Sequence, residues 1–155
     1  MLYQWVLEQK CRQRRVEEVV VFLHKTIFAM EEEKIRIIEY FENYISREIL
    51  LEESLREIAK RLRQNVYPNG EIVWETVFWE RKKEWNLDAD TFDILLGIGM
   101  GFFGKKRSEN ICFLQKKLRE LEKQQGKRKE KDANERKVWI PVGMLSGIML
   151  IIILV

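Results

Sequence analysis

The last eighteen residues of this 155-residue chain, from Val138 to Val155, contain no charged side chain. At a rise of about 1.5 Å per residue, a helix of this length measures ~27 Å, close to the thickness of a bilayer's hydrocarbon core. Eleven of the eighteen are Leu, Ile or Val, which together favour insertion by roughly 3–5 kcal/mol. In a soluble domain, such a helix would need partners around its whole circumference. The segment therefore predicts a C-terminal transmembrane helix over residues 138–155.

The residues beside this segment predict its orientation. A basic flank precedes it, formed by Lys127, Arg128, Lys129, Lys131, Arg136 and Lys137, and no charge follows. Because Lys and Arg are retained on the cytoplasmic side, we expect a single-pass protein of the cell membrane with its N-terminal body in the cytoplasm. The predicted membrane anchor has Trp139 at the interface and Pro141 in the first helical turn. Gly143 and Gly147 form a GxxxG pair that would allow close approach of another membrane helix.

The titratable residues of the body give little support to an enzyme or a metal site. Cys11 and Cys112 are the only cysteines and lie far apart, and His24 is the only histidine. Zinc sites rich in Cys or His are therefore excluded. We expect His24 on a helix surface. The sequence predicts a protein that is not an enzyme and uses no cofactor and no small-molecule substrate.

The body has the apolar periodicity of helices. Between Val16 and Leu62, apolar residues recur every three or four positions, which predicts two or three amphipathic helices. The strongest turn signal is the segment Tyr67-Pro68-Asn69-Gly70, because proline fixes φ and Asn-Gly tolerates positive φ. Further helices follow the turn, with Trp74, Trp79 and Trp85 at the core or its edge and an N-cap at Asp88, Asp90 or Thr91. The predicted fold class is all-α, a compact cytoplasmic helical bundle followed by one transmembrane helix.

Residues 99–104 match the pattern GxGxxG of dinucleotide-binding loops. That fingerprint requires a preceding strand within a βαβ unit, whereas the segment before Gly99 has the pattern of a helix. Two phenylalanines also occupy the positions where a pyrophosphate would approach the backbone. We therefore interpret these glycines as sites of close helix packing and a tight turn.

A last amphipathic helix is predicted over residues 107–125, and a basic linker follows it. From Lys105 to Lys137 there are thirteen Lys and Arg against six Asp and Glu. A basic stretch can bind nucleic acid or anionic lipid headgroups, and its position beside a membrane span favours lipid. We expect membrane lipid as a partner and no nucleic acid.

The arrangement of these features resembles the stage III sporulation protein AB family of endospore-forming bacteria. The resemblance covers most of the chain after residue 40, and in the second half it is carried by Gly70, Trp74, Leu95-Leu96-Gly97, Gly101, the Leu114–Leu121 helix, Gly143 and Gly147. The earlier part is carried by Tyr44, Leu50, Leu51, Ser54, Leu55, Ile58 and Ala59. The chain departs from the family pattern at Ile49, Gly104 and Ser108, where the family commonly has Pro, Asp and Gln.

This resemblance implies a cytoplasmic domain similar to that of the type II secretion inner-membrane platform protein. It implies a structural role in the mother-cell membrane, docking a secretion-type ATPase onto other membrane proteins of a channel complex, with contacts expected around Arg56, Arg61, Arg81 and Glu84. Family members tend to begin with a membrane helix, so residues 1–15 are interpreted as a segment left from a lost or truncated one. The predicted domain then covers 16–125, the basic juxtamembrane linker 126–137 and the span 138–155.

One alternative from the sequence is a tail-anchored coiled-coil adaptor unrelated to sporulation. It would pair through the Leu51–Leu62 or Leu114–Leu121 apolar seams. Both seams are shorter than the three or four heptads that sustain a coiled coil, so a compact bundle fits better.

Overall fold

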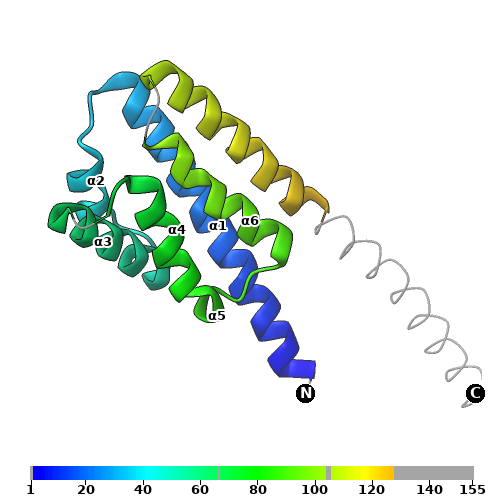
Figure 1. Ribbon diagram of the computed structural model, residues 1–155. Coiled ribbons are helices and arrows are strands. Elements are labelled where there is room, and N and C mark those ends of the chain that lie inside the picture. Colours follow the sequence, from blue (N-terminus) through cyan, green and yellow to red (C-terminus); the bar gives the residue numbers. More distant parts are fainter. Residues whose placement is uncertain (1, 66, 104–105, 128–155) are drawn as a thin grey trace, which may run out of the picture. The chain divides into compact units, whose positions relative to one another are not determined.

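The computed structural model describes residues 2–65, 67–103 and 106–127, and every regular element in these ranges is a helix (Figure 1). The labelled elements are α1 (Leu2–Glu32), α2 (Ile37–Asn43), α3 (Ile49–Gln64), α4 (Gly70–Glu80), α5 (Lys82–Trp85), α6 (Ala89–Gly97) and the 3₁₀ helix η1 (Ile98–Gly101). One more helix covers residues 107–127. The all-α prediction is confirmed, and the last helix begins where its leucine spacing places it.

The chain divides into two units, Met1–Glu122 and Lys123–Val155. All labelled elements belong to the first unit, whereas only residues 123–127 of the second are described. The predicted span over 138–155 lies outside the described residues. Within the described ranges, no helix combines the length and the apolar character needed to cross a membrane.

The core of the first unit is built around aromatic side chains contributed by distant parts of the chain. Phe41 from α2, Trp74 from α4 and Phe102 after η1 are all buried, with ring centroids 5.3–5.9 Å apart. Phe22 from α1 lies 6.0 Å from both Phe41 and Phe102. The Trp74 indole nitrogen donates a hydrogen bond of 2.9 Å to the carbonyl of Leu95 in α6. Four helical segments are therefore held together at one point.

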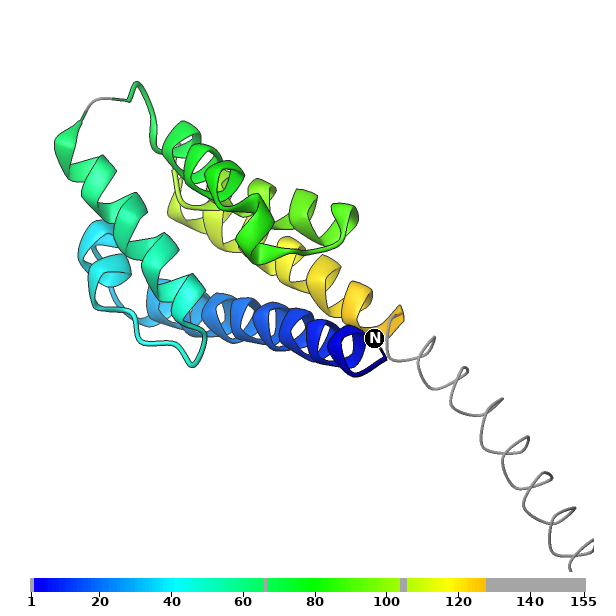
Figure 2. The same ribbon diagram turned by 90° about the horizontal axis from the view of Figure 1, so that it is seen from below.

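The longest helix crosses the predicted boundary at residue 15. α1 runs without interruption from Leu2 to Glu32, and its first buried residue is Val16. Residues 2–15 therefore belong to the same helix as the buried residues from Val16 onward. Figure 2 shows this part of α1 extending along one side of the first unit, toward the end marked N.

The turn before α4 is present, but its chemistry differs from the prediction. Asn69 has an extended backbone (φ −152°), and its side-chain oxygen accepts a hydrogen bond of 3.0 Å from the backbone nitrogen of Ile72. The left-handed residue is instead Asn65 (φ 52°), which ends α3. Asn69 thus acts as an N-cap, which satisfies a backbone donor of the first turn.

The two predicted coiled-coil seams lie inside the bundle. Leu51, Leu55 and Ile58 of α3 are buried, and so are the leucines of the 107–127 helix, Leu114, Leu118 and Leu121. Pairing with a second chain through these seams would require the core to open. The structure therefore argues against the coiled-coil adaptor.

The C-terminal end of α1 has no basic residue in its last turn, and a distant arginine supplies the charge. Arg107 donates through Nε to the Met30 carbonyl at 2.7 Å and through Nη2 to the Glu33 carbonyl at 2.8 Å. It also donates through Nη2 to Met30. A cation at this end of a helix satisfies free carbonyls and opposes the negative end of the helix dipole.

Replacing Arg107 with alanine should lower the free energy of unfolding by about 1–2 kcal/mol, because the carbonyls at the end of α1 lose their donor. Urea denaturation followed by far-UV circular dichroism would measure the change. The neighbouring exposed residue provides a control, since Lys106→Ala should change stability by less than about 0.5 kcal/mol. Equal effects of the two substitutions would contradict this role of Arg107.

Candidate functional site: the charged face of α3 and α4

The glycines of the GxGxxG match are packing sites where the structure describes them. A Cβ added to Gly99 would lie 2.6 Å from Cγ of Trp74, and one added to Gly101 would lie 2.5 Å from a methyl carbon of Leu114. Gly70 has the same relation to the ring of Phe103. The segment before Gly99 is α6. The predicted close packing is confirmed at Gly99 and Gly101, whereas Gly104 lies outside the described residues.

The three tryptophans predicted at the core or its edge have different environments. Trp74 and Trp85 are buried, as predicted. Trp79 is 53% exposed and touches the core only at its edge, where its ring meets Phe92 at a centroid distance of 5.4 Å. Lys82 lies over the same Trp79 ring, with its nitrogen 4.7 Å from the centroid.

Asp88 is the N-cap residue of α6, but it makes no side-chain capping bond there.

His24 lies on the exposed side of α1, as predicted, with Nε2 2.9 Å from a carboxylate oxygen of Glu122. In the part of the chain that the structure describes, no group of three or more His, Cys, Asp or Glu side chains is arranged to hold a metal ion. Cys11 and Cys112 are both exposed free thiols.

A continuous charged face, which we call the α3–α4 face, runs across the outer sides of α3, α4 and α5. Arg61 is at its centre. Its Nε donates to Glu57 at 2.9 Å, and its two terminal nitrogens donate to the two oxygens of Glu80 at 3.1 and 2.7 Å. This two-point contact fixes the α3 arginine against α4, because the planar guanidinium matches a carboxylate.

A second arginine, Arg81, also connects α3 with the end of α4. Arg81 donates from Nη1 to Glu53 of α3 at 3.0 Å, and Glu84 lies 3.9 Å away. Arg56 pairs with Glu52 at 3.6 Å along α3. The four residues expected to make contacts, Arg56, Arg61, Arg81 and Glu84, thus belong to one surface, although the sequence did not indicate their ion-pair partners.

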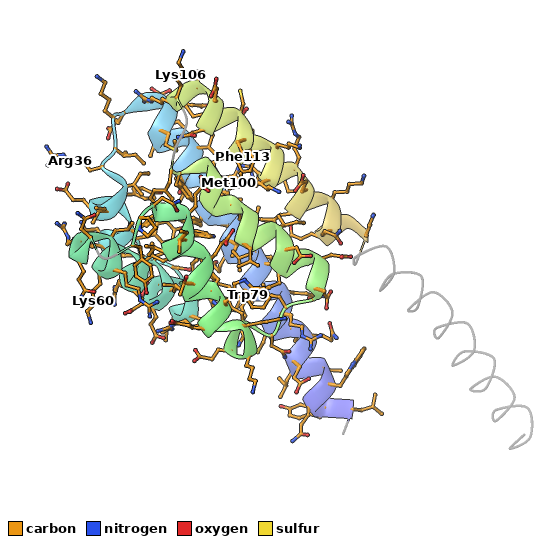
Figure 3. All side chains as sticks on the ribbon, viewed as in Figure 1. Arg36, Lys60, Trp79, Met100, Lys106 and Phe113 are labelled. Atoms are coloured by element: carbon orange, nitrogen blue, oxygen red, sulfur yellow. The ribbon has the colours of Figure 1, made fainter. Side chains whose placement is uncertain are left out.

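Lys60 also belongs to the α3–α4 face and lies on α3, one helical turn after Arg56. Its side chain is exposed, and Figure 3 shows it at the outer edge of α3. The described residues place no carboxylate in ion-pair contact with it. Lys60 is therefore a cation of this face that a binding partner could reach without breaking an existing ion pair.

The pairing of Glu80 makes stability depend on pH. Hydrogen bonds from Arg61 lower the pKa of Glu80 below its ordinary value of 4.5. A carboxyl whose pKa is lower in the folded protein stabilises it above the ordinary value, and this contribution disappears as the pH falls through the folded-state pKa.

We expect Glu80→Gln to cost at most about 1 kcal/mol at neutral pH, since the Glu80 side chain is 53% exposed and solvent weakens its ion pair. The difference from the unsubstituted protein should begin to shrink as the pH falls below 4.5 and should disappear once the pH is below the lowered pKa of Glu80 in the folded protein. Urea denaturation at a series of pH values would test this. A difference that does not change with pH would mean that the ion pair is not responsible.

Three arginines in the first half of α1 hold this helix to other segments through hydrogen bonds, which the apolar periodicity of the sequence does not predict. Arg14 donates to the carbonyl of Arg47 at 2.6 Å, and Arg15 donates to the carbonyl of Trp85 at 2.8 Å. Arg12 donates to the Asn86 side chain at 3.2 Å. These arginines connect α1 to the segments that precede α3 and follow α5.

The predicted membrane site is described at only one residue. Lys127 is exposed at the end of the 107–127 helix. The other flank residues, Arg128, Lys129, Lys131, Arg136 and Lys137, and the anchor residues Trp139, Pro141, Gly143 and Gly147 lie outside the described residues.

The fold and this surface define an all-helical domain with an aromatic core and one densely ion-paired face. A sequence model of the family described as stage III sporulation protein AB matches residues 10–155. The chain belongs to this family, and its role is related to sporulation. No curated protein matches the chain.

A solved structure titled stage III sporulation protein AB (SpoIIIAB) is similar in fold. Its TM-score is 0.63 at 12% sequence identity, and the match covers 77% of this chain and 94% of that chain. At this identity the comparison supports the helical architecture.

The residues that carry the family resemblance in the described part are mainly packing residues. Gly70, Gly97 and Gly101 lie against side chains, and Trp74 is central to the core. The earlier motif residues, Tyr44, Leu50, Leu51, Ser54, Leu55, Ile58 and Ala59, are all buried. The family pattern therefore specifies the fold, while a binding surface has to be identified from the exposed residues.

Proposed function

We propose that this protein is a non-enzymatic, membrane-anchored platform of a sporulation complex that docks a cytoplasmic secretion-type ATPase at the mother-cell membrane. The observation that carries the proposal is the family match over residues 10–155, which includes the uncharged segment at the C-terminal end. That segment provides the membrane attachment, and the helical bundle provides the protein contacts. Holding the bundle beside the bilayer raises its effective concentration for other membrane proteins of the complex.

The α3–α4 face is the surface that we assign to the ATPase. Arg61 and Arg81 are held by contacts that cross from α3 to α4, so these two side chains lose little freedom when a partner binds. Charges of both signs lie side by side, which favours a partner surface with a complementary arrangement. Lys60 supplies a cation for a carboxylate of that partner.

Co-purification from membranes would test the docking. The secretion-type ATPase, expected to be encoded in the same operon, would be expressed with the full-length chain and recovered through a tag on the chain. Lys60→Glu should reduce the recovered ATPase about tenfold, because it places a like charge against the partner's carboxylate. Lys116→Glu, at an exposed position of the 107–127 helix, is the matched control and should leave recovery unchanged. Unchanged recovery with Lys60→Glu would remove the α3–α4 face from the proposal.

Cell fractionation would test the membrane attachment. We expect the full-length protein to sediment with membranes, to resist extraction by high salt and to be released by detergent, because insertion of an apolar helix does not depend on ionic contacts. Recovery in the soluble fraction without detergent would contradict the anchor. A soluble, elongated dimer would instead support the coiled-coil adaptor.

A further inference from the structure

A cavity of about 280 Å³ lies between the end of α1, the segment that leads to α2, and the start of the 107–127 helix. In Figure 1, α1 ends and the 107–127 helix begins at the same end of the first unit. None of the residues that line this cavity belongs to the α3–α4 face. A molecule bound here would therefore be bound in addition to the proposed partner of that face.

The cavity combines apolar walls with one buried acceptor. Met30 and Phe102 are buried core residues, and Ile35 and Ile37 pack against the core. Asn110 also lines the cavity and is only 7% exposed. Its side-chain oxygen Oδ1 is buried and has no hydrogen-bond partner among the described residues. Because a buried acceptor without a donor is unfavourable, nearly all such groups in folded proteins are paired.

We propose that this cavity binds the indole ring of a tryptophan from a partner protein, with the ring N–H donating a hydrogen bond to Oδ1 of Asn110. Rotation about the Cβ–Cγ bond of asparagine is broad, so a small rotation directs Oδ1 toward the ring. The proposal goes beyond the docking of an ATPase and does not depend on it. The acceptor, the neighbouring charges and the volume of the cavity each favour this ligand.

The single acceptor favours a group that donates a hydrogen bond and accepts none. The indole N–H of tryptophan is such a group, and the rest of the ring suits apolar walls. The bundle pairs its own buried indoles in the same way. Trp74 donates to the carbonyl of Leu95 at 2.9 Å, and Trp85 donates to the hydroxyl oxygen of Ser54 at 3.3 Å.

The charges around the cavity disfavour a cationic donor. Arg107 lines the cavity, and its guanidinium already donates to the carbonyls of Met30 and Glu33. A lysine or arginine from a partner would be placed beside this like charge. It would also lose its hydration against the apolar walls. A neutral donor avoids both costs.

The volume of the cavity suits one side chain. Sites for drug-sized molecules measure about 300–1,000 Å³, and this cavity is smaller. Tryptophan is enriched among the residues that fill pockets at protein interfaces and dominate their binding energy. Glu33 and Lys34 line the cavity and are exposed, so they form a rim on which the main chain of a partner can lie. A water molecule could reach Asn110, but the indole N–H would reproduce its hydrogen bond and cover the apolar walls as well.

Fluorine NMR of the full-length chain in mild detergent would test the site, with ring-fluorinated N-acetyltryptophan amide as the probe. The fluorine signal reports on the probe alone, although the chain has five tryptophans of its own. The probe should bind with a Kd of about 0.1–1 mM, as expected for a ligand of this size. The derivative methylated on the ring nitrogen should bind about tenfold more weakly, because it has no ring donor. Equal binding of the two probes would overturn the proposal.

Two variants connect the binding to this cavity. Asn110→Leu removes the acceptor and leaves no buried oxygen unpaired, so it should fold normally by far-UV circular dichroism and bind both probes equally weakly. Ile35→Glu retains Asn110 but places a carboxylate in the apolar wall, and it should weaken binding of the donor-bearing probe about tenfold or more. The matched control is Ile45→Glu, at a 79% exposed position outside the cavity, which should leave binding unchanged. Equal losses with Ile35→Glu and Ile45→Glu would mean that the probe binds elsewhere.

Two further measurements identify the source of the ring. Self-association in analytical ultracentrifugation that Asn110→Leu abolishes would place a tryptophan of a second copy in the cavity and overturn the assignment to a partner protein. Free indole should bind about threefold more weakly than the amide probe, because it has no main-chain atoms to contact the rim. Equal affinity would assign the cavity to a small molecule instead. Failure of the ATPase docking would not affect these results, since no ATPase is present.

Discussion

Replacing Trp74 with alanine is expected to lower the free energy of unfolding of the bundle by about 4–5 kcal/mol. The side chain is 1% exposed and contacts the rings of Phe41, Phe78 and Phe102. Truncating a buried tryptophan removes its transfer free energy and leaves a cavity, a loss of about 3–5 kcal/mol. The Leu95 carbonyl would also lose the hydrogen bond from the indole, although it keeps the one from the Ile98 backbone nitrogen, and this loss adds about 1 kcal/mol.

Urea denaturation of the full-length protein in mild detergent, followed by far-UV circular dichroism, would measure the effect of Trp74→Ala. The matched control is Trp79→Ala, which removes the same side chain at a half-exposed position one and a half turns later. That substitution should cost about 1 kcal/mol, mainly the edge contact with Phe92. Comparable losses at the two positions would mean that Trp74 is not a central core residue.

Replacing Gly99 with valine is expected to cost about 3 kcal/mol or more. An added Cβ would lie 2.6 Å from Cγ of Trp74 and 2.9 Å from its Cβ. Because neighbouring rings hold the indole, it cannot move aside, and overpacking of this kind is destabilising by about 1–3 kcal/mol. Branching at the new Cβ brings two further carbons toward the same ring.

Gly126 provides the glycine control, because a Cβ added there meets no atom within 4 Å. Gly126→Ala should leave the melting temperature unchanged or raise it slightly, since alanine favours a helix over glycine by about 0.5–1 kcal/mol. Differential scanning calorimetry would compare the two variants. A Gly99 variant as stable as the unsubstituted protein would remove the packing explanation of this glycine run and reopen a ligand-binding one.

The helices themselves were predictable, because their signals are local. Apolar residues that recur every three or four positions place one side of a helix toward a core wherever that core lies. Val73, Trp74, Val77 and Phe78 are buried as a group for this reason. The exposure of Trp79 was not predictable in the same way. Its side chain lies at the margin of the apolar side of α4, and the helix that packs beside α4 decides whether such a side chain is exposed or buried.

The charged face was only partly predictable. The sequence indicates that Arg56, Arg61 and Arg81 lie on solvated helix sides, but it does not pair Arg61 with Glu80, which lies 19 positions later. Ion pairs between helices depend on the crossing geometry of α3 and α4, which many residues determine together. The same holds for Arg107, whose acceptor Met30 lies 77 positions earlier.

The sequence by itself determined the helical class, the turn before α4, the packing role of Gly99 and Gly101, and the family. These properties follow from periodicity and from side-chain chemistry within a few residues. The tertiary structure alone decided which charges meet on the α3–α4 face, that Arg107 caps α1, and that residues 2–7 stay exposed while the rest of the helix enters the core. Those features depend on distances between residues far apart in the chain, and such distances are fixed only when the helices pack against one another.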